Sequence, residues 1–148
     1  MFDMARQPDK GLYENFLRLD GRLNRWRYFK RAMLLGVITV ALLIVLLIVA
    51  AVTASPQNNF AVKIVLGFML IPHFCLMVRR LHDMDKGETL AYVYSALQVV
   101  YVFIGDFGQG ELSPIELVIT VISTPIALYI LFGSGTKGDN QYGSDPLE

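Results

Sequence analysis

The sequence has few of the side chains from which reaction centres are built. Its 148 residues include one cysteine and two histidines. A lone Cys75 excludes an internal disulfide framework and any CxxC metal or redox pair. His73 and His82 are nine residues apart, which matches no ordinary metal-ligand spacing. We therefore predict no metal, no cofactor and no catalytic residue.

Charge is absent from long stretches of the chain, which excludes an ordinary soluble domain. Hydrophobic residues make up 54% of the sequence, and the mean hydropathy is +0.47. Residues 32–52 carry no charge and span roughly 30 Å of hydrocarbon as a helix. About thirty polar-rich residues precede them, so we expect an uncleaved anchor rather than a signal peptide. The sequence predicts an all-α integral membrane protein, one membrane domain over residues 1–148, with four transmembrane helices at about 32–52, 60–78, 89–104 and 114–132.

Capping residues predict where some of these helices begin and end. Asn24 is a candidate N-cap for the first helix. Ser113, Pro114 and Glu116 give the last helix an N-cap, a proline at its first position and a capping-box glutamate. Gly133 is its predicted stop, and residues 133–148 are interpreted as a polar cytoplasmic tail. The segment at 89–104 is about 24 Å long as a helix, which makes it the weakest span.

Basic residues predict the orientation in the membrane. Of thirteen Lys and Arg residues, eight lie before Ala32, three in residues 79–88 and one in the tail, against Lys63 alone on the other side. Cytoplasmic loops carry the excess of Lys and Arg, so we expect both termini in the cytoplasm.

The first 31 residues mix these cations with aromatic residues, a composition typical of the membrane interface. Hydrophobic residues recur there at spacings of four, three and four, which predicts a short amphipathic helix that Gly21 interrupts. The residues of this stripe are Leu12, Phe16, Leu19 and Leu23.

A group of ionisable residues is predicted to lie on the cytoplasmic side. Its members are Arg22, Arg25, Arg79, Arg80, His82 and Asp83. Two interpretations remain open: the cations enforce topology and lock the bundle, or arginine forks bind an anionic lipid headgroup or a partner. Catalysis by His82 and Asp83 is disfavoured, because neighbours on a helix seldom face each other and no nucleophile is identifiable.

The first transmembrane helix has four cations at its positive N-terminal end, namely Arg25, Arg27, Lys30 and Arg31. This arrangement opposes the helix dipole. An anion should compensate it, and the candidates are lipid phosphates or the carboxylates of Asp20 and Asp83.

Several polar residues fall inside the predicted spans. They are His73, Tyr94, Gln98, Tyr101 and Thr120, with Ser123 and Thr124 beside the last. Those of the third and fourth helices should face inward. Such side chains usually act as hydrogen-bonding contacts between membrane helices, and a substrate path is the alternative.

Three segments together resemble a bacterial inner-membrane family, domain of unknown function 805, also called YhaH-like. They are Gly21-Arg22-Leu23-Asn24-Arg25, then Val78-Arg79-Arg80-Leu81-His82-Asp83, then Gly138-Asp139-Asn140-Gln141-Tyr142-Gly143 with Pro146. The resemblance implies a small multi-pass protein of the bacterial inner membrane without an assigned reaction. This chain departs from the family pattern after Asp83, where a Gly-x-Ser-Gly-Trp-like turn is usual, and at Arg27, where a glutamate often stands.

We expect a structural or interaction protein. Its candidate partners are membrane lipids, among them anionic phospholipid. A second copy of the chain or another membrane protein is a further candidate, and we expect no binding to nucleic acid. A transporter or channel subunit and a lipid-headgroup enzyme are the alternatives. All three motifs lie on the cytoplasmic side of this topology, so we expect them to meet in one polar cluster.

Overall fold

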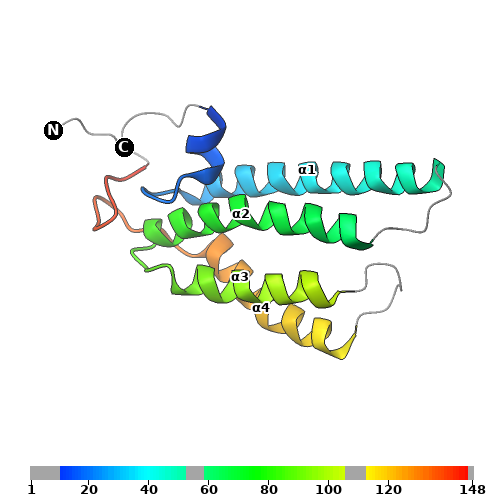
Figure 1. Cartoon of the computed structure of the whole chain (residues 1–148). Helices are drawn as coiled ribbons and strands as arrows, with labels where there is room; N and C mark the ends of the chain where they lie inside the picture. The colour runs from blue at the N-terminus through cyan, green and yellow to red at the C-terminus, as the bar shows by residue number, and fades with distance from the viewer. Residues whose placement is uncertain (1–10, 53–58, 106–112, 147–148) are drawn as a thin grey trace.

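The computed structural model describes residues 11–52, 59–105 and 113–146, and within these residues the fold is helical (Figure 1). A π-helical turn, η2, spans Tyr13–Leu17. It is followed by α1 Arg25–Val52, α2 Asn59–Asp83, α3 Thr89–Ile104 and α4 Pro114–Phe132.

Successive helices pack beside one another, α1 on α2, α2 on α3 and α3 on α4, and α4 also contacts α1. Figure 1 shows the segment before α1, the turn between α2 and α3, and the tail after α4 together at one end of the bundle. Three of the four helices are long and apolar enough to cross a membrane, and α3 is a shorter apolar helix. We call the end that holds residues 11–24, 84–88 and 133–146 the polar end.

The predicted caps of α1 and α4 are confirmed. The Asn24 side-chain oxygen accepts the Arg27 backbone N–H at 2.8 Å, at the start of α1. Ser113 and Glu116 form a reciprocal capping box, with Pro114 at the first helical position. The Gly133 N–H donates to the Tyr129 carbonyl at 2.8 Å where α4 ends.

Two helices are longer than their apolar segments. Because Asn24 caps it, α1 begins seven residues before the predicted span, at Arg25. The prediction that α2 ends near Val78 is wrong, since α2 continues to Asp83. The added turn is buried, and cations near a helix C-terminus suit the dipole. After α2 the chain turns, and the Lys86 backbone N–H donates to the Leu81 carbonyl. Asp85 adopts the left-handed region there, with φ 56°.

The predicted N-terminal stripe is wrong in extent. Helical structure ends at Leu17, where Arg18 becomes extended, before Leu19 and Leu23 are reached. Gly21 has φ +85°, which lets the chain turn toward α2, and the Leu23 N–H then donates to the Arg79 carbonyl at 3.0 Å. Leu23 is therefore buried, whereas Leu12 and Leu19 remain exposed.

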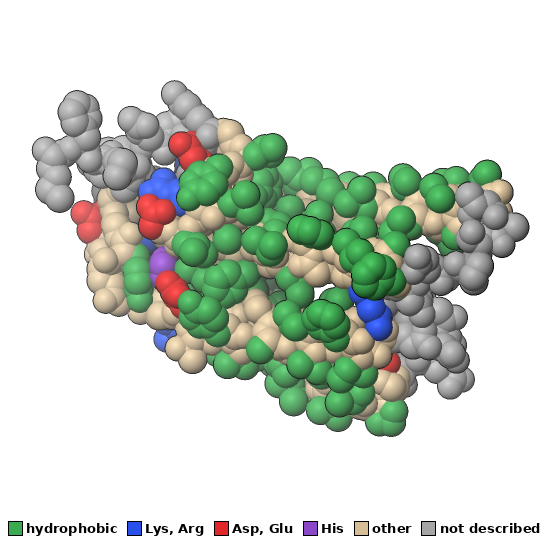
Figure 2. Space-filling view, viewed as in Figure 1, with side chains coloured by type: hydrophobic (Ala, Val, Ile, Leu, Met, Phe, Trp, Pro, Cys, Tyr) green, Lys and Arg blue, Asp and Glu red, His purple; other side chains and the backbone are tan. Residues whose placement is uncertain are grey.

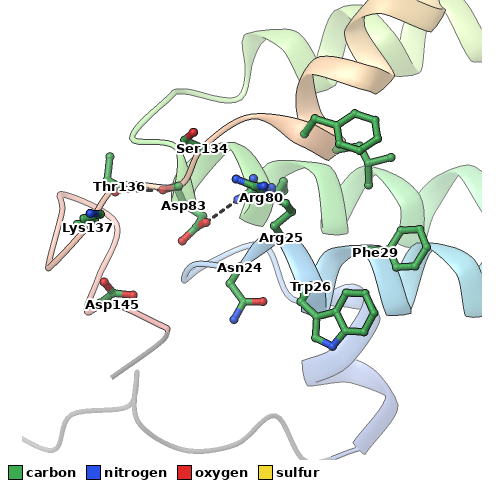
Figure 3. A pocket seen from close by; sticks show the side chains of 13 residues that line it. Asn24, Arg25, Trp26, Phe29, Arg80, Asp83, Ser134, Thr136, Lys137 and Asp145 are labelled. Carbon is green, nitrogen blue, oxygen red and sulfur yellow. Dashed lines mark hydrogen bonds and ion pairs between the residues drawn. The ribbon is translucent and has the colours of Figure 1, made fainter.

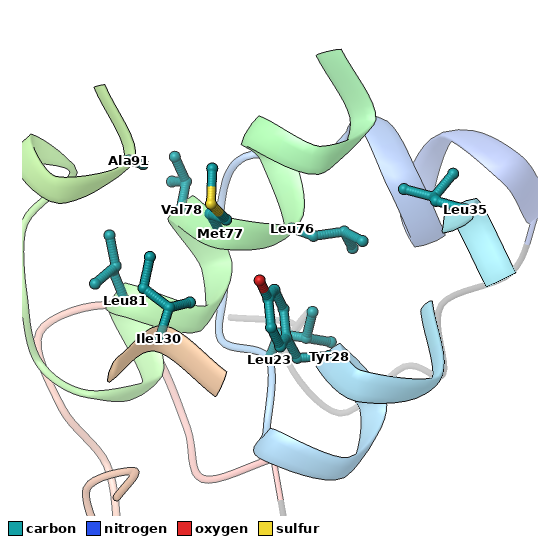
Figure 4. Close-up of a cluster of buried hydrophobic side chains, with 9 residues drawn as sticks. All are labelled: Leu23, Tyr28, Leu35, Leu76, Met77, Val78, Leu81, Ala91 and Ile130. Atoms are coloured by element: carbon teal, nitrogen blue, oxygen red, sulfur yellow. The ribbon is translucent and has the colours of Figure 1, made fainter. Parts of the chain in front are cut away.

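The hydrophobic core lies toward the polar end (Figure 4). Leu23 and Tyr28 meet the last turns of α2, with contributions from Ala91 of α3 and Ile130 of α4. Farther along the helices, large apolar side chains are exposed, including Val37 and Leu47 of α1. Figure 2 shows hydrophobic side chains over most of the helical part of one face, with most charged side chains near the polar end. This surface suits a lipid environment.

Candidate functional site

A buried carboxylate lies at the centre of the polar end. Asp83 is the last residue of α2. One of its carboxylate oxygens accepts hydrogen bonds from Arg22 Nη2 at 3.2 Å and from Arg22 Nε at 3.3 Å. Its other oxygen accepts Arg80 Nη1 at 2.5 Å. At most 5% of each of the three side chains is exposed. Desolvated charges require compensation of this kind, so one carboxylate holds two guanidinium groups together. We call Arg22, Arg80 and Asp83 the ion cluster.

Arg80 joins the ion cluster to the end of α4. Its Nε donates to the Ile130 carbonyl at 3.1 Å, and its Nη2 donates to the Gly133 carbonyl. The last carbonyls of a helix have no partner within the helix, and they form the negative end of its dipole. The Arg80 guanidinium supplies both hydrogen-bond donors and positive charge there, so it fixes α4 against α2.

Arg22 joins the ion cluster to the tail. Its Nη1 donates to the Gly138 carbonyl at 2.6 Å, and its Nη2 donates to the Thr136 carbonyl at 2.6 Å. The Thr136 backbone N–H in turn donates to the Asp83 carbonyl at 2.8 Å, and its hydroxyl donates to the same oxygen at 3.0 Å. The tail, which the sequence indicates only as polar, is therefore folded onto the end of α2.

His82 contacts the tail and the N-terminal segment. Its ring stacks on Tyr142, with the centroids 3.9 Å apart and the planes 6° from parallel. Its Nδ1 lies 3.3 Å from the Gly21 carbonyl, and its own carbonyl accepts Asn140 Nδ2 at 2.9 Å. Asn140 and Gly143 pair through their backbones, which closes the loop that carries Tyr142. The three motifs thus meet at the polar end, as the sequence predicts.

The two remaining predicted cations lie at the edge of the ion cluster. Arg79 is buried and donates from Nη1 to the Glu14 carbonyl at 2.8 Å, which holds η2 against α2. Arg25 is exposed at the start of α1. Of the six predicted residues, four therefore connect α2 with α4, the tail and the segment before α1. Arg79 holds η2, and Arg25 remains on the surface.

Three tail residues of this site were not among the predicted site residues, namely Thr136, Asn140 and Tyr142. The signal for them was the third motif, which covers Asn140 and Tyr142. Gly135 also belongs to the site, because a Cβ at this position would overlap the Asp83 carboxylate. The close approach of the tail backbone to Asp83 therefore requires glycine.

A cavity of about 700 Å³ opens beside the ion cluster, between the start of α1, the end of α4 and the tail (Figure 3). Figure 3 shows Trp26 and Phe29 of α1 on one side of it, and Thr136, Lys137 and Asp145 of the tail on the other. The remaining lining residues are Asn24, Arg25, Arg80, Asp83, Leu131, Phe132, Ser134 and Gly135.

The comparisons with known proteins bear on this site. The model of a family described as "Protein of unknown function (DUF805)" matches residues 16–144. The chain belongs to the DUF805 family. The match extends from η2 into the tail, so it covers every element that contributes to the ion cluster. No curated protein and no solved structure matches this DUF805 chain significantly.

Of the two candidate anions for the cations at the start of α1, the carboxylates of Asp20 and Asp83 are paired elsewhere in this DUF805 protein, and the lipid phosphates stay a prediction. Asp83 is paired within the ion cluster, and Asp20 pairs with Arg18 at 2.5 Å. The hydrogen bond from Arg18 lowers the pKa of the Asp20 carboxyl. Arg25, Arg27 and Lys30 are exposed and make no ion pair with described residues; Lys30 lies 5.0 Å from the centre of the Trp26 ring.

The polar residues within the predicted spans do not share one orientation. His73, Tyr94, Gln98 and Tyr101 are half-buried. The prediction that the polar residues of α4 face inward holds for Ser123, which is buried, but it is wrong for Thr120 and Thr124, which are exposed. Their hydroxyls donate to carbonyls one turn earlier in α4, so no partner on another helix is needed.

Lys63 lies near the start of α2, away from the polar end. Its Nζ donates to the Phe103 carbonyl at 2.9 Å, near the end of α3. This contact satisfies one terminal carbonyl of the short helix α3. Among the described residues, no group of three or more His, Cys, Asp or Glu side chains is arranged to hold a metal ion.

Proposed function

We propose that this DUF805 protein is a structural or interaction protein of the bacterial inner membrane, with the polar end in the cytoplasm. The long apolar helices and the exposed apolar surface support a multi-pass membrane protein. The basic residues flanking the polar end support its cytoplasmic orientation, because cytoplasmic loops carry the excess of Lys and Arg.

The observation that carries this proposal is that the charged groups of the ion cluster bind one another and backbone carbonyls of the same chain. Arg22 and Arg80 direct their donors at Asp83 and at carbonyls of α4 and the tail. Asp83 accepts from both arginines, so it is not free to orient His82 or to act as a base. The ion cluster therefore serves as a lock that holds the tail and α4 on the end of α2, rather than as a reaction centre.

The locked polar end presents a separate set of exposed groups to the membrane interface. Arg25, Arg27 and Lys30 are exposed on the first two turns of α1, next to the exposed rings of Trp26 and Phe29. Cations beside interfacial aromatic rings suit anionic lipid headgroups. We therefore assign headgroup contact to these residues and not to the buried Arg79 and Arg80.

The distribution of polar side chains favours this function over a transporter or channel subunit. Thr120 and Thr124 are exposed and bonded to their own helix, while Gln98 is half-buried on α3. Polar groups lining one path would have to face a common interior. A second copy of the chain or another membrane protein is the other proposed partner, through the exposed apolar faces.

The experiment is native mass spectrometry of the protein purified from bacterial membranes. We expect Arg27→Gln with Lys30→Gln to lower the number of retained anionic lipids. The matched control, Lys63→Gln with Lys86→Gln, removes the same charge away from the start of α1. Equal retention in both double variants would contradict headgroup contact by α1.

A further inference from the structure

We propose that the cavity beside the ion cluster is a specific site for one anionic phospholipid of the phosphatidylglycerol type. This proposal deepens the proposed function, on which it rests, by naming a bound lipid and its residues. Arg25 and Lys137 would bind the phosphate, and the acyl chains would follow the apolar flanks of α1 and α4.

The polarity of the cavity changes along its length in the manner of an amphiphile. Its large apolar lining residues are Trp26 and Phe29 of α1 and Leu131 and Phe132 of α4. Large apolar side chains are exposed along the rest of both helices, and Phe132 is itself 65% exposed. The opposite side is formed by the polar tail. A ligand that fills both sides needs a polar head and an apolar chain, and a soluble anion would leave the apolar side without a partner.

The charge of the cavity selects an anion. Three cationic side chains and two carboxylates line it, which gives a net charge of +1. Arg80 is ion-paired with Asp83 within the ion cluster. Arg25 and Lys137 are exposed and make no ion pair with described residues, so their charges face the cavity without a fixed counter-ion. The positive end of the α1 dipole adds to this field.

The remaining polar residues fit a glycerol headgroup. Asp145 places a carboxylate in the lining, and carboxylate oxygens accept hydrogen bonds from hydroxyl groups. Ser134 adds a hydroxyl on the same side. The volume of about 700 Å³ lies within the roughly 300–1,000 Å³ typical of small-molecule sites. It admits a headgroup and glycerol backbone while the chains lie outside on the helices.

The test uses Trp26, the only tryptophan of the chain, as a reporter within the cavity. The full-length protein is placed in phosphatidylcholine nanodiscs that contain increasing fractions of a lipid brominated on its acyl chains, and quenching of Trp26 fluorescence is measured. We expect brominated phosphatidylglycerol to reach half-maximal quenching at a mole fraction about tenfold lower than brominated phosphatidylcholine, a preference equivalent to ~1.4 kcal/mol.

Variants and a soluble competitor complete the test. Arg25→Gln with Lys137→Gln should abolish the preference, whereas Lys63→Gln with Lys86→Gln should keep it. Glycerol 3-phosphate should not relieve the quenching; if it does so at micromolar concentration, the site binds a soluble phosphate and the proposal is overturned. Equal quenching of the unmodified protein by both brominated lipids also overturns it, without any variant having to fold.

The two experiments distinguish failure of the cavity site from failure of the proposed function. If Arg27→Gln with Lys30→Gln lowers anionic-lipid retention while both brominated lipids quench alike, headgroup contact stands and the cavity site is wrong. If retention is also unchanged, the proposed function is wrong as well.

Discussion

The Asp83→Asn substitution is the sharpest perturbation of the ion cluster. It keeps the size of the side chain and removes its charge, so two buried guanidinium groups lose their shared counter-ion. Removing one partner of a buried ion pair costs about 3–5 kcal/mol. Because the asparagine oxygen still accepts one hydrogen bond, we expect the lower end, about 3 kcal/mol. For a chain of this size the loss corresponds to a fall in melting temperature of roughly 6–12 °C.

The chain carries its own reporter for this measurement. Cys75 is its only cysteine and is buried on α2, 6% exposed. A thiol-reactive fluorescent dye added during a thermal ramp in detergent therefore reports the opening of the bundle. The matched control is Asp20→Asn, which removes the same charge from the exposed pair with Arg18, where Asp20 is 73% exposed. Exposed pairs contribute about 0–1 kcal/mol, so the control should move the transition by roughly 0–4 °C.

The comparison of the two variants decides the role of Asp83. A shift for Asp83→Asn no larger than that for Asp20→Asn would refute the reasoning that the buried carboxylate holds the polar end together. A large shift for Asp83→Asn alone would support it.

Three further predictions concern the tail and α4. Gly135→Ala should lower the same thermal transition because its Cβ overlaps the buried carboxylate, whereas Gly67→Ala, with open space at its Cβ, should be neutral or slightly stabilising; similar shifts would contradict the close approach of the tail. Tyr142→Ala should speed limited proteolysis of the tail because stacking on His82 is lost, and Tyr142→Phe, which keeps the ring, should not; equal rates in both variants would argue against stacking as the anchor. Ser113→Ala should destabilise the protein by about 1 kcal/mol in the thiol assay through loss of the capping box, and an unchanged transition would count against the cap.

The sequence was sufficient for features that depend on local chemistry. Apolar runs predict the helices, and Ser113, Pro114 and Gly133 predict both ends of α4, because caps act within one turn. The continuation of α2 to Asp83 was missed. The charge-rich residues 79–83 predict a loop from their composition alone. They extend the helix because segments distant in the chain bury them.

The candidate site was predictable in part for the same reason. The motifs identify Arg22, Arg80 and Asp83 as members of a group, but not which charges pair. Pairing depends on the path of the tail, which brings Thr136 within 2.6 Å of Arg22 and leaves Arg25 outside. The tail has no hydrophobic periodicity that would indicate this docking, since backbone carbonyls and one stacked ring hold it.

Hydrogen–deuterium exchange of the tail tests the central claim most directly, because the Thr136 amide donates to the Asp83 carbonyl and the Gly138 amide to the Asp145 carboxylate. In detergent or nanodiscs, peptides from residues 133–146 should exchange slowly in the unmodified protein and fast in Asp83→Asn. Complete exchange of these peptides in the unmodified protein at the earliest time point would contradict a tail held by the ion cluster.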